Sequence, residues 1–91
     1  MVFWVYIVVC ADGTYYTGIA TDVPRRLLEH NGLKPKGARY TSARRPVKLA
    51  YAAQFTNRSQ AQKEEIRIKR LPRPDKEHLI ASGRVAAAHS L

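Results

Sequence analysis

Residues 15–30 read YYTGIATDVPRRLLEH, so a strand-like run that contains a glycine is followed by a basic pair on a short helix. The preceding run is VFWVYIVVC, residues 2–10, which is almost continuously apolar, β-branched and aromatic. This composition favours a central strand that is covered on both faces. Asp12 and Gly13 lie between the two runs and suit a tight turn. The two runs therefore predict a β-hairpin.

A short helix is predicted over residues 23–30. Asp22 is a good N-cap, and Pro24 fits the first helical turn, where its missing N–H is not needed. Asn31 and Gly32 supply the usual C-terminal stop. The helix signals agree at both ends.

The rest of the chain predicts one more strand and two more helices. Ser59 is the expected N-cap of the first of these helices. We expect a single domain over residues 1–82 and a C-terminal tail over 83–91. The further elements are a basic loop at 32–46, a strand at 47–55, a charged amphipathic helix at 59–71 and a short helix at 75–82. The predicted class is α/β (α+β), a small three-stranded, largely antiparallel sheet flanked by helices in the order β-β-α-β-α-α.

The charge balance predicts a polyanionic partner. Sixteen Lys and Arg against seven Asp and Glu give a formal net charge of +9 and a pI of about 10.2, which is typical of domains that bind nucleic acid. Cys10 is the single cysteine, which excludes an internal disulfide and a multi-cysteine zinc site. The apolar N-terminal run of about ten residues is too short to span a bilayer. We therefore expect a soluble cytoplasmic protein that binds no membrane.

Two tripeptides carry a resemblance to a known family. The first strand contains VYI at residues 5–7, and the second contains YTG at residues 16–18, with an arginine eight residues beyond the glycine and a histidine four further on. This pattern resembles the GIY-YIG nuclease family, and within it the small stand-alone bacterial members of the UPF0213 type, over residues 3–82. The resemblance implies a GIY-YIG endonuclease fold, hydrolysis of phosphodiester bonds in DNA with one Mg²⁺ or Mn²⁺ ion, and a role in DNA repair or recombination.

The resemblance also implies roles for five side chains. Tyr16 would receive the proton of the attacking water, and Tyr6 beside it would orient water or phosphate. Arg26 would bind the oxygens of the scissile phosphate, for which its planar donors are suited. His30 would contact the phosphate or assist proton transfer, and Glu65 would be the metal ligand.

Helical periodicity bears on two of these choices. It favours Arg26 over Arg25, because Glu29 lies one turn beyond Arg25 and can neutralise it. It does not choose between Glu64 and Glu65, since one lies within the apolar stripe of the helix and the other at its edge. The family pattern prefers Glu65, and Glu64 stays open.

A set of further residues is expected to hold the substrate. Gly18 weakens a strand but allows a ligand or side chain to approach closely, here the scissile phosphate or Arg26. The basic loop is expected to hold the flanking backbone. The predicted substrate-binding residues are Gly18, Lys36, Arg39, Tyr40, Arg44, Arg45 and Lys69.

Two competing functions remain. Ile19 stands where many relatives carry a polar or basic residue, which favours a nucleic-acid-binding module that cuts little. The chain could also act as a subunit of a repair complex, with a partner protein supplying specificity. The sequence leaves open DNA versus RNA, the shape of the substrate and the oligomeric state.

Overall fold

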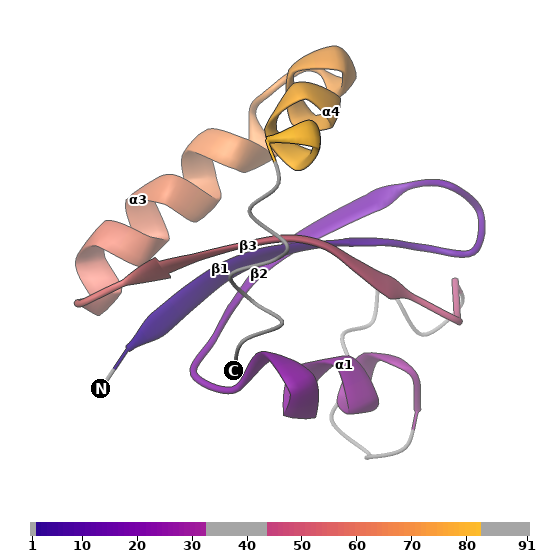
Figure 1. Ribbon diagram of the computed structural model, residues 1–91, viewed down its shortest axis with the longest axis horizontal. Helices are drawn as coiled ribbons and strands as arrows, with labels where there is room; N and C mark the ends of the chain where they lie inside the picture. Colours follow the sequence, from indigo (N-terminus) through magenta and orange to yellow (C-terminus); the bar gives the residue numbers. More distant parts are fainter. Residues whose placement is uncertain (1, 33–43, 83–91) are drawn as a thin grey trace.

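A computed structural model of the chain describes residues 2–32 and 44–82. It contains a three-stranded sheet with α1 on one face and α3 and α4 on the other (Figure 1). This confirms the predicted order of strands and helices, whereas the tail lies outside the described residues. The elements are β1 (Phe3–Val9), β2 (Tyr15–Ala20), α1 (Val23–His30), β3 (Lys48–Phe55), α3 (Arg58–Lys69) and α4 (Arg73–Ala81).

The sheet has the order β2-β1-β3, and both pairings are antiparallel. β1 is central, as its apolar sequence predicts. Its register places Tyr6 opposite Gly18 on β2 and opposite Ala52 on β3. Consequently the two tripeptide motifs lie side by side at the middle of the hairpin.

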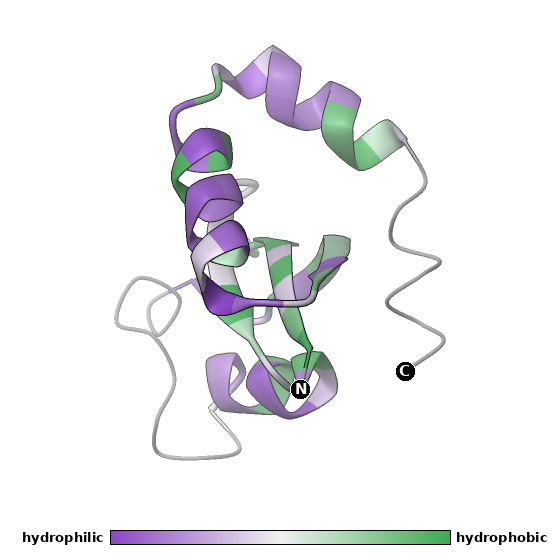
Figure 2. Cartoon of the chain, turned by 90° about the vertical axis from the view of Figure 1, so that its left-hand side faces the viewer, coloured by the Kyte–Doolittle hydropathy of each residue, from purple (hydrophilic) through white to green (hydrophobic). Residues whose placement is uncertain are grey.

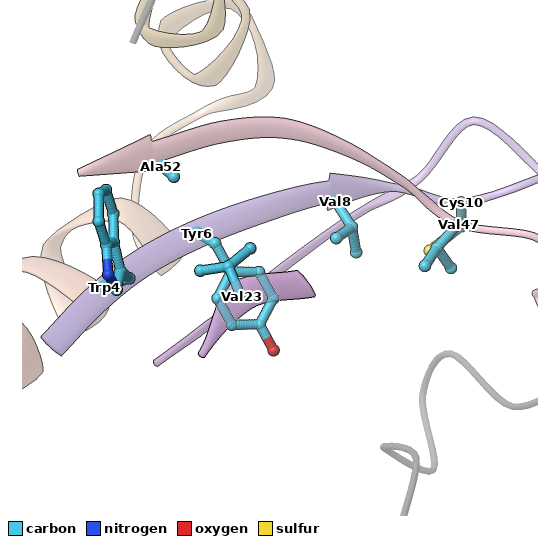
Figure 3. Close-up of a cluster of buried hydrophobic side chains, with 7 residues drawn as sticks. All are labelled: Trp4, Tyr6, Val8, Cys10, Val23, Val47 and Ala52. Atoms are coloured by element: carbon cyan, nitrogen blue, oxygen red, sulfur yellow. The ribbon is translucent and has the colours of Figure 1, made fainter. Parts of the chain in front are cut away.

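Alternate residues of β1 belong to two separate hydrophobic cores, one on each face of the sheet. Trp4, Tyr6 and Val8 belong to the cluster on the α1 face, and Figure 3 shows Tyr6 beside Val23 of α1. Val5 and Ile7 point to the other face, beneath α3 and α4. All five of these β1 residues are at most 3% exposed, and each contributes roughly 1.5–3 kcal/mol through burial of its apolar surface. In Figure 2 the sheet is mainly apolar and α3 mainly hydrophilic, as expected for a sheet covered on both faces.

The ends of α1 are fixed as the sequence predicts. The Asp22 carboxylate accepts a hydrogen bond from the backbone N–H of Arg25 at 3.1 Å. Gly32 beyond the helix has φ +85°, a conformation that favours glycine. Asn31 accepts from the N–H of Val47 at 2.7 Å, which ties the end of the helix to the start of β3. Local sequence therefore sets the ends of α1, and the contact with Val47 fixes its C-terminal end against the sheet.

The start of α3 differs from the prediction. Asn57 is the N-cap, and its side chain accepts from the N–H of Gln60 at 2.8 Å. The prediction of Ser59 was wrong, because Asn and Ser are equally good caps and local sequence does not choose between them. α4 begins at Arg73, two residues earlier than expected, since Pro74 fits its first turn.

Candidate active site

A buried hydrogen bond between Tyr6 and His30 forms the centre of the candidate site. The Tyr6 hydroxyl lies 2.7 Å from Nε2 of His30. Tyr6 is 1% exposed on the central strand, and His30 is fully buried at the C-terminal end of α1. The two predicted site residues are 24 positions apart in sequence and meet because α1 packs over the hairpin.

Burial keeps both members of this pair uncharged near neutral pH. Loss of hydration raises the pKa of the Tyr6 phenol to about 12, although the nearby Arg26 guanidinium opposes the shift. Loss of hydration also lowers the pKa of His30 to about 4, and the charge of Arg26 lowers it further. The phenol therefore donates and the neutral imidazole accepts through Nε2, which leaves the ring proton on Nδ1.

Tyr16 joins the pair from β2. Its ring meets the His30 ring edge-on, with 5.2 Å between centroids, and its side chain is only partly buried. The neighbouring Tyr15 points to the other face of the sheet, where Arg73 lies 4.4 Å above its ring. Only the second tyrosine of the pair therefore belongs to the candidate site.

Arg26 reaches the same cluster from α1. It lies within hydrogen-bonding reach of the Tyr6 hydroxyl, and its side chain is 26% exposed. Its Nη1 is 2.7 Å from Oε1 of Glu29, while Nε of Arg25 is 3.6 Å from the other oxygen of that carboxylate. The expected Arg25–Glu29 pair is confirmed, but Glu29 also pairs with Arg26, so this carboxylate does not distinguish the two arginines as helical periodicity predicted. Residues three and four apart on a helix are both neighbours, and here the shorter contact goes to Arg26.

Gly18 makes room for Tyr6. A Cβ at this position would lie 2.6 Å from the Tyr6 hydroxyl oxygen and 2.8 Å from the ring carbon that carries it. The space was expected to serve a phosphate or Arg26, whereas the phenol of the opposite strand fills it. Gly18 therefore contributes to the site by leaving space for the Tyr6 side chain.

The candidate site opens on one side into a hollow of about 330 Å³ at the end of the sheet where β2 runs into α1. We call this space the edge hollow. It is bounded by α1, by residues of β1 and β2, and by the first residue of α3. Its lining includes Arg25, Arg26 and Glu29 from α1, Phe3 and Ile19 from the sheet, and Arg58 from α3.

The two candidate metal ligands on α3 are held differently. Glu64 is paired with Arg67 through two bonds of 2.7 and 2.6 Å. Glu65 is paired with Lys69 at 3.2 Å, so this lysine has a partner within the protein as well as its predicted substrate role. One contact to a flexible ammonium is more easily exchanged for a metal ion than a two-bond pair with a guanidinium.

Glu65 lies away from the cluster around His30. α3 covers the face of the sheet opposite α1 (Figure 1), and the structure does not place this carboxylate beside the tyrosines. Helical periodicity puts Glu65 two turns, about 10 Å, from Arg58 on the same flank of α3. Glu65 therefore shares its flank of α3 with Arg58, which lines the edge hollow.

Two arginines of the basic loop are bound to the fold. Arg44 pairs with Asp12 of the hairpin turn at 3.1 Å. Arg45 donates from Nε to the backbone oxygen of His30 at 2.7 Å, where a cation also suits the C-terminal end of a helix. Both therefore anchor the loop, and their predicted contacts with substrate stay a prediction. Lys36, Arg39 and Tyr40 lie outside the described residues.

Comparisons with known proteins agree with this geometry. A family model described as the GIY-YIG catalytic domain matches residues 2–78. The chain belongs to the GIY-YIG family, a family of nucleases. A UPF0213 protein of Desulfotalea psychrophila is 53% identical over 77 residues, 85% of this chain and 69% of that protein. A UPF0213 protein of Halobacterium salinarum is 51% identical over 84% of this chain and 96% of its own length.

Two solved structures are similar to the fold of this chain. The solution structure of a UPF0213 protein from Bacillus halodurans has a TM-score of 0.60 at 37% identity, and covers 99% of this chain and 94% of its own. A protein from E. faecalis gives a TM-score of 0.61 at 36% identity, over 90% of this chain and 85% of its own. These names state no substrate, so the substrate is inferred from the site.

Three residues of this GIY-YIG site were missed by sequence reasoning. Glu29 was taken only as a partner of Arg25, although its side chain is 13% exposed and contacts Arg26. Phe3 and Arg58 come together at the rim of the edge hollow, with the guanidinium carbon 5.0 Å from the ring centre. The side of β1 on which Phe3 lies was readable from strand alternation, but nothing local indicates that α3 begins beside it.

The described part of the GIY-YIG chain contains no preformed cluster of metal-binding side chains. Among residues 2–32 and 44–82, no group of three or more His, Cys, Asp or Glu side chains is placed to hold an ion. In the same ranges, no helix has the length and apolar character needed to cross a membrane.

Proposed function

We propose that the protein is a divalent-metal-dependent endonuclease that hydrolyses phosphodiester bonds in DNA. The observation that carries the proposal is the convergence of Tyr6, Tyr16, Arg26 and His30 on one face of the hairpin. Membership of a nuclease family and the net charge of +9 support a polyanionic substrate.

Arg26 is the group that binds the scissile phosphate in this proposal. Its side chain is partly exposed and lines the edge hollow, so a phosphate can approach it from solvent. Two parallel N–H donors match two phosphate oxygens and stabilise charge that grows in the transition state. Glu29 aligns the guanidinium until a phosphate arrives, and the phosphate competes with this carboxylate for the same donors.

Tyr16, in its phenolate form, is the group that takes the proton from the attacking water and becomes the neutral phenol. Its ring rests on His30 and its side chain reaches the surface. Tyr6 is different, because it is buried and its pKa is raised to about 12. We assign Tyr6 the role of a positioning residue that holds His30 and Arg26, in place of the water-orienting role expected from sequence.

His30 supports the site as a neutral ring of fixed orientation. Its imidazole is uncharged at neutral pH because its pKa is lowered to about 4. Nε2 is occupied by Tyr6, so the ring is fixed in orientation and lies edge-on to Tyr16. A fixed, neutral imidazole adds no positive charge and polarises the phenol that contacts it.

One Mg²⁺ or Mn²⁺ ion fits the donor set if it is held by Glu65. A hard divalent ion accepts a single carboxylate, with water and phosphate oxygens as its other ligands. Glu65 pairs with Lys69 and lies on the same flank of α3 as Arg58. A bound ion of this kind polarises a phosphate oxygen and lowers the pKa of its water.

A catalytically weak binding module is the second candidate. Two observations favour it: Glu29 occupies Arg26, and Glu65 lies on the helix covering the opposite face. A repair complex in which a partner protein supplies specificity is compatible with either candidate.

Metal-stimulated nicking of supercoiled plasmid separates the two candidates. We expect the wild type to nick DNA with Mg²⁺ or Mn²⁺ and not in EDTA. Glu65→Gln should lower the rate by about 100-fold or more, while the matched change Glu64→Gln should lower it by less than about tenfold, because Glu64 is bound to Arg67. DNA and RNA of the same sequence are compared in parallel. Binding without any metal-stimulated product would favour the second candidate.

A further inference from the structure

The edge hollow continues the candidate active site around the open edge of the sheet. Arg26 lines it from the α1 face, while Phe3 and Ile19 belong to the apolar cluster on the α3 face. Within residues 2–32 and 44–82, β2 is the edge strand of the sheet. A volume of about 330 Å³ lies within the range of small-molecule sites, about 300–1,000 Å³.

The arginines that line the edge hollow differ in whether a carboxylate is paired with them. The Asp22 carboxylate caps α1, and Glu29 is shared between Arg25 and Arg26. Arg58 has no carboxylate partner among the described residues, and its guanidinium stacks over the Phe3 ring. The positive charge that remains in the hollow is therefore located at Arg58.

Apolar surface lies directly beside this charge. Phe3 and Ile19 are partly buried side chains that also face the hollow. A guanidinium next to exposed ring and aliphatic surface is matched by a ligand that joins a phosphate to an apolar ring system. Nucleotides have this composition, and base stacking on aromatic side chains contributes about 1–3 kcal/mol per base in nucleic-acid complexes.

We propose that the edge hollow binds the nucleotide that flanks the scissile phosphate, with its phosphate on Arg58 and its sugar and base against Phe3 and Ile19. The assignment rests on the proposed function for the identity of the substrate, since Arg26 at the inner end of the hollow is the group that takes the scissile phosphate. It adds a second phosphate contact on α3, so the substrate strand crosses the edge of β2 from one face of the sheet to the other.

A second arginine provides a matched control. Arg73 also stacks on an aromatic ring, 4.4 Å from the centre of Tyr15, and is similarly exposed on the surface. It donates to the backbone oxygen of Gly13 in the hairpin turn and takes no part in lining the edge hollow. Arg58→Ala and Arg73→Ala therefore remove the same formal charge and the same kind of stack, although Arg73 is also paired with Glu77 at 3.3 Å, and only Arg58 lines the hollow.

Nuclear magnetic resonance of the ¹⁵N-labelled full chain, without metal, tests the site directly. Thymidine 5′-monophosphate, thymidine and inorganic phosphate are titrated separately. We expect the nucleotide to shift the amide signals of Ile19, Ala20 and Thr21 at lower concentration than phosphate or thymidine alone. Arg58→Ala should weaken this binding by about tenfold, Arg58→Lys by less, and Arg73→Ala should leave it unchanged.

Binding of a 20-base-pair DNA duplex in EDTA extends the test to the polymer. Arg58→Ala should lower the slope of log affinity against log salt by about 1, and Arg73→Ala should lower it less. Equal effects of the two variants, or equal binding of phosphate and nucleotide, would overturn the proposal. If the wild type nicks plasmid but Arg58→Ala binds nucleotide normally, the hollow is not the site and the proposed function stands. If no DNA is cut but Arg58→Ala alone loses the nucleotide, the site stands and the nuclease assignment fails.

Discussion

The two faces of the sheet bury different chemistry, although β1 supplies both. On the α1 face, the buried phenol of Tyr6 and the buried imidazole of His30 share a hydrogen bond of 2.7 Å. On the α3 face, Val5, Ile7 and Ile68 form an apolar cluster. Burial of polar groups costs free energy that hydrogen bonds must offset, and natural domains accept this cost mainly at functional sites. The buried hydrogen-bonded pair therefore marks the α1 face as the centre of the candidate site, although the other face also buries the Tyr51 phenol.

Charged side chains on the two faces also differ, in how far they are exposed to solvent. Arg26 and Glu29 on α1 are 26% and 13% exposed at their side chains, and both adjoin the buried pair. On α3, Arg67 and Lys69 are 53% and 51% exposed, so their ion pairs are largely solvated and contribute about 0–1 kcal/mol each. Loss of the Arg26–Glu29 pair should therefore reduce activity, whereas loss of the solvated Glu64–Arg67 pair should change stability only slightly.

The largest difference is expected between two adjacent tyrosines. Tyr16 faces His30, whereas Tyr15 lies under Arg73 on the other face. Tyr16→Phe removes the phenolic oxygen that takes the proton and should lower the nicking rate by about 100-fold or more. Tyr15→Phe should leave the rate unchanged. Initial rates of plasmid nicking measure both, and equal rates for the two variants would remove the distinction between the faces.

Low pH should destabilise the protein, because His30 is buried as a neutral ring on the α1 face. Because the pKa of His30 is about 4 when folded and about 6.5 when unfolded, the unfolded chain binds the proton first as pH falls. Stability is then lost from about pH 6.5 down to pH 4, by about 3 kcal/mol in total. Urea unfolding at several pH values measures this loss. His30→Gln should show a shallower dependence, and an unchanged pH profile would contradict the neutral, buried imidazole.

A smaller difference, in stability and activity, is expected between substitutions at Gly18 and Gly13. Gly18→Ala places a Cβ against the Tyr6 phenol, so it should cost about 1–3 kcal/mol and reduce activity by displacing Tyr6 from His30. Gly13 has φ +83°, and a Cβ there would meet nothing within 4 Å, so Gly13→Ala should cost about 1 kcal/mol through backbone strain alone. Thermal unfolding and nicking rates are measured for both. Loss of activity in both variants would show that hairpin stability, not the fit behind Tyr6, controls the site.

Local sequence determined much of the fold. The caps of α1 at Asp22 and Asn31 and the turn at Gly13 were predictable because each depends on residues close in the chain. The placement of both motif tyrosines on a hairpin followed from the two strands. The cap of α3 at Asn57 was not predictable, since Ser59 offers the same chemistry two residues later.

The interior of the candidate site could not be predicted in the same way. The burial of His30 depends on how α1 docks on the sheet, and the helix itself contains no signal for it. The choice of Glu29 between two arginines depends on side-chain rotamers and local burial. The contact of Arg58 with Phe3 joins segments 55 residues apart, so only the tertiary structure shows it.

The nicking rates of Arg26→Ala and Arg25→Ala, measured side by side with saturating Mg²⁺, test the central claim most directly. The two arginines are adjacent on α1, share Glu29, and differ in exposure, 26% against 71%. Arg26→Ala should lose about 100- to 1,000-fold in rate with its thermal unfolding little changed, and Arg25→Ala should stay within about fivefold of the wild type. Equal rates for the two variants would contradict the claim that phosphodiester hydrolysis is centred on the α1 face.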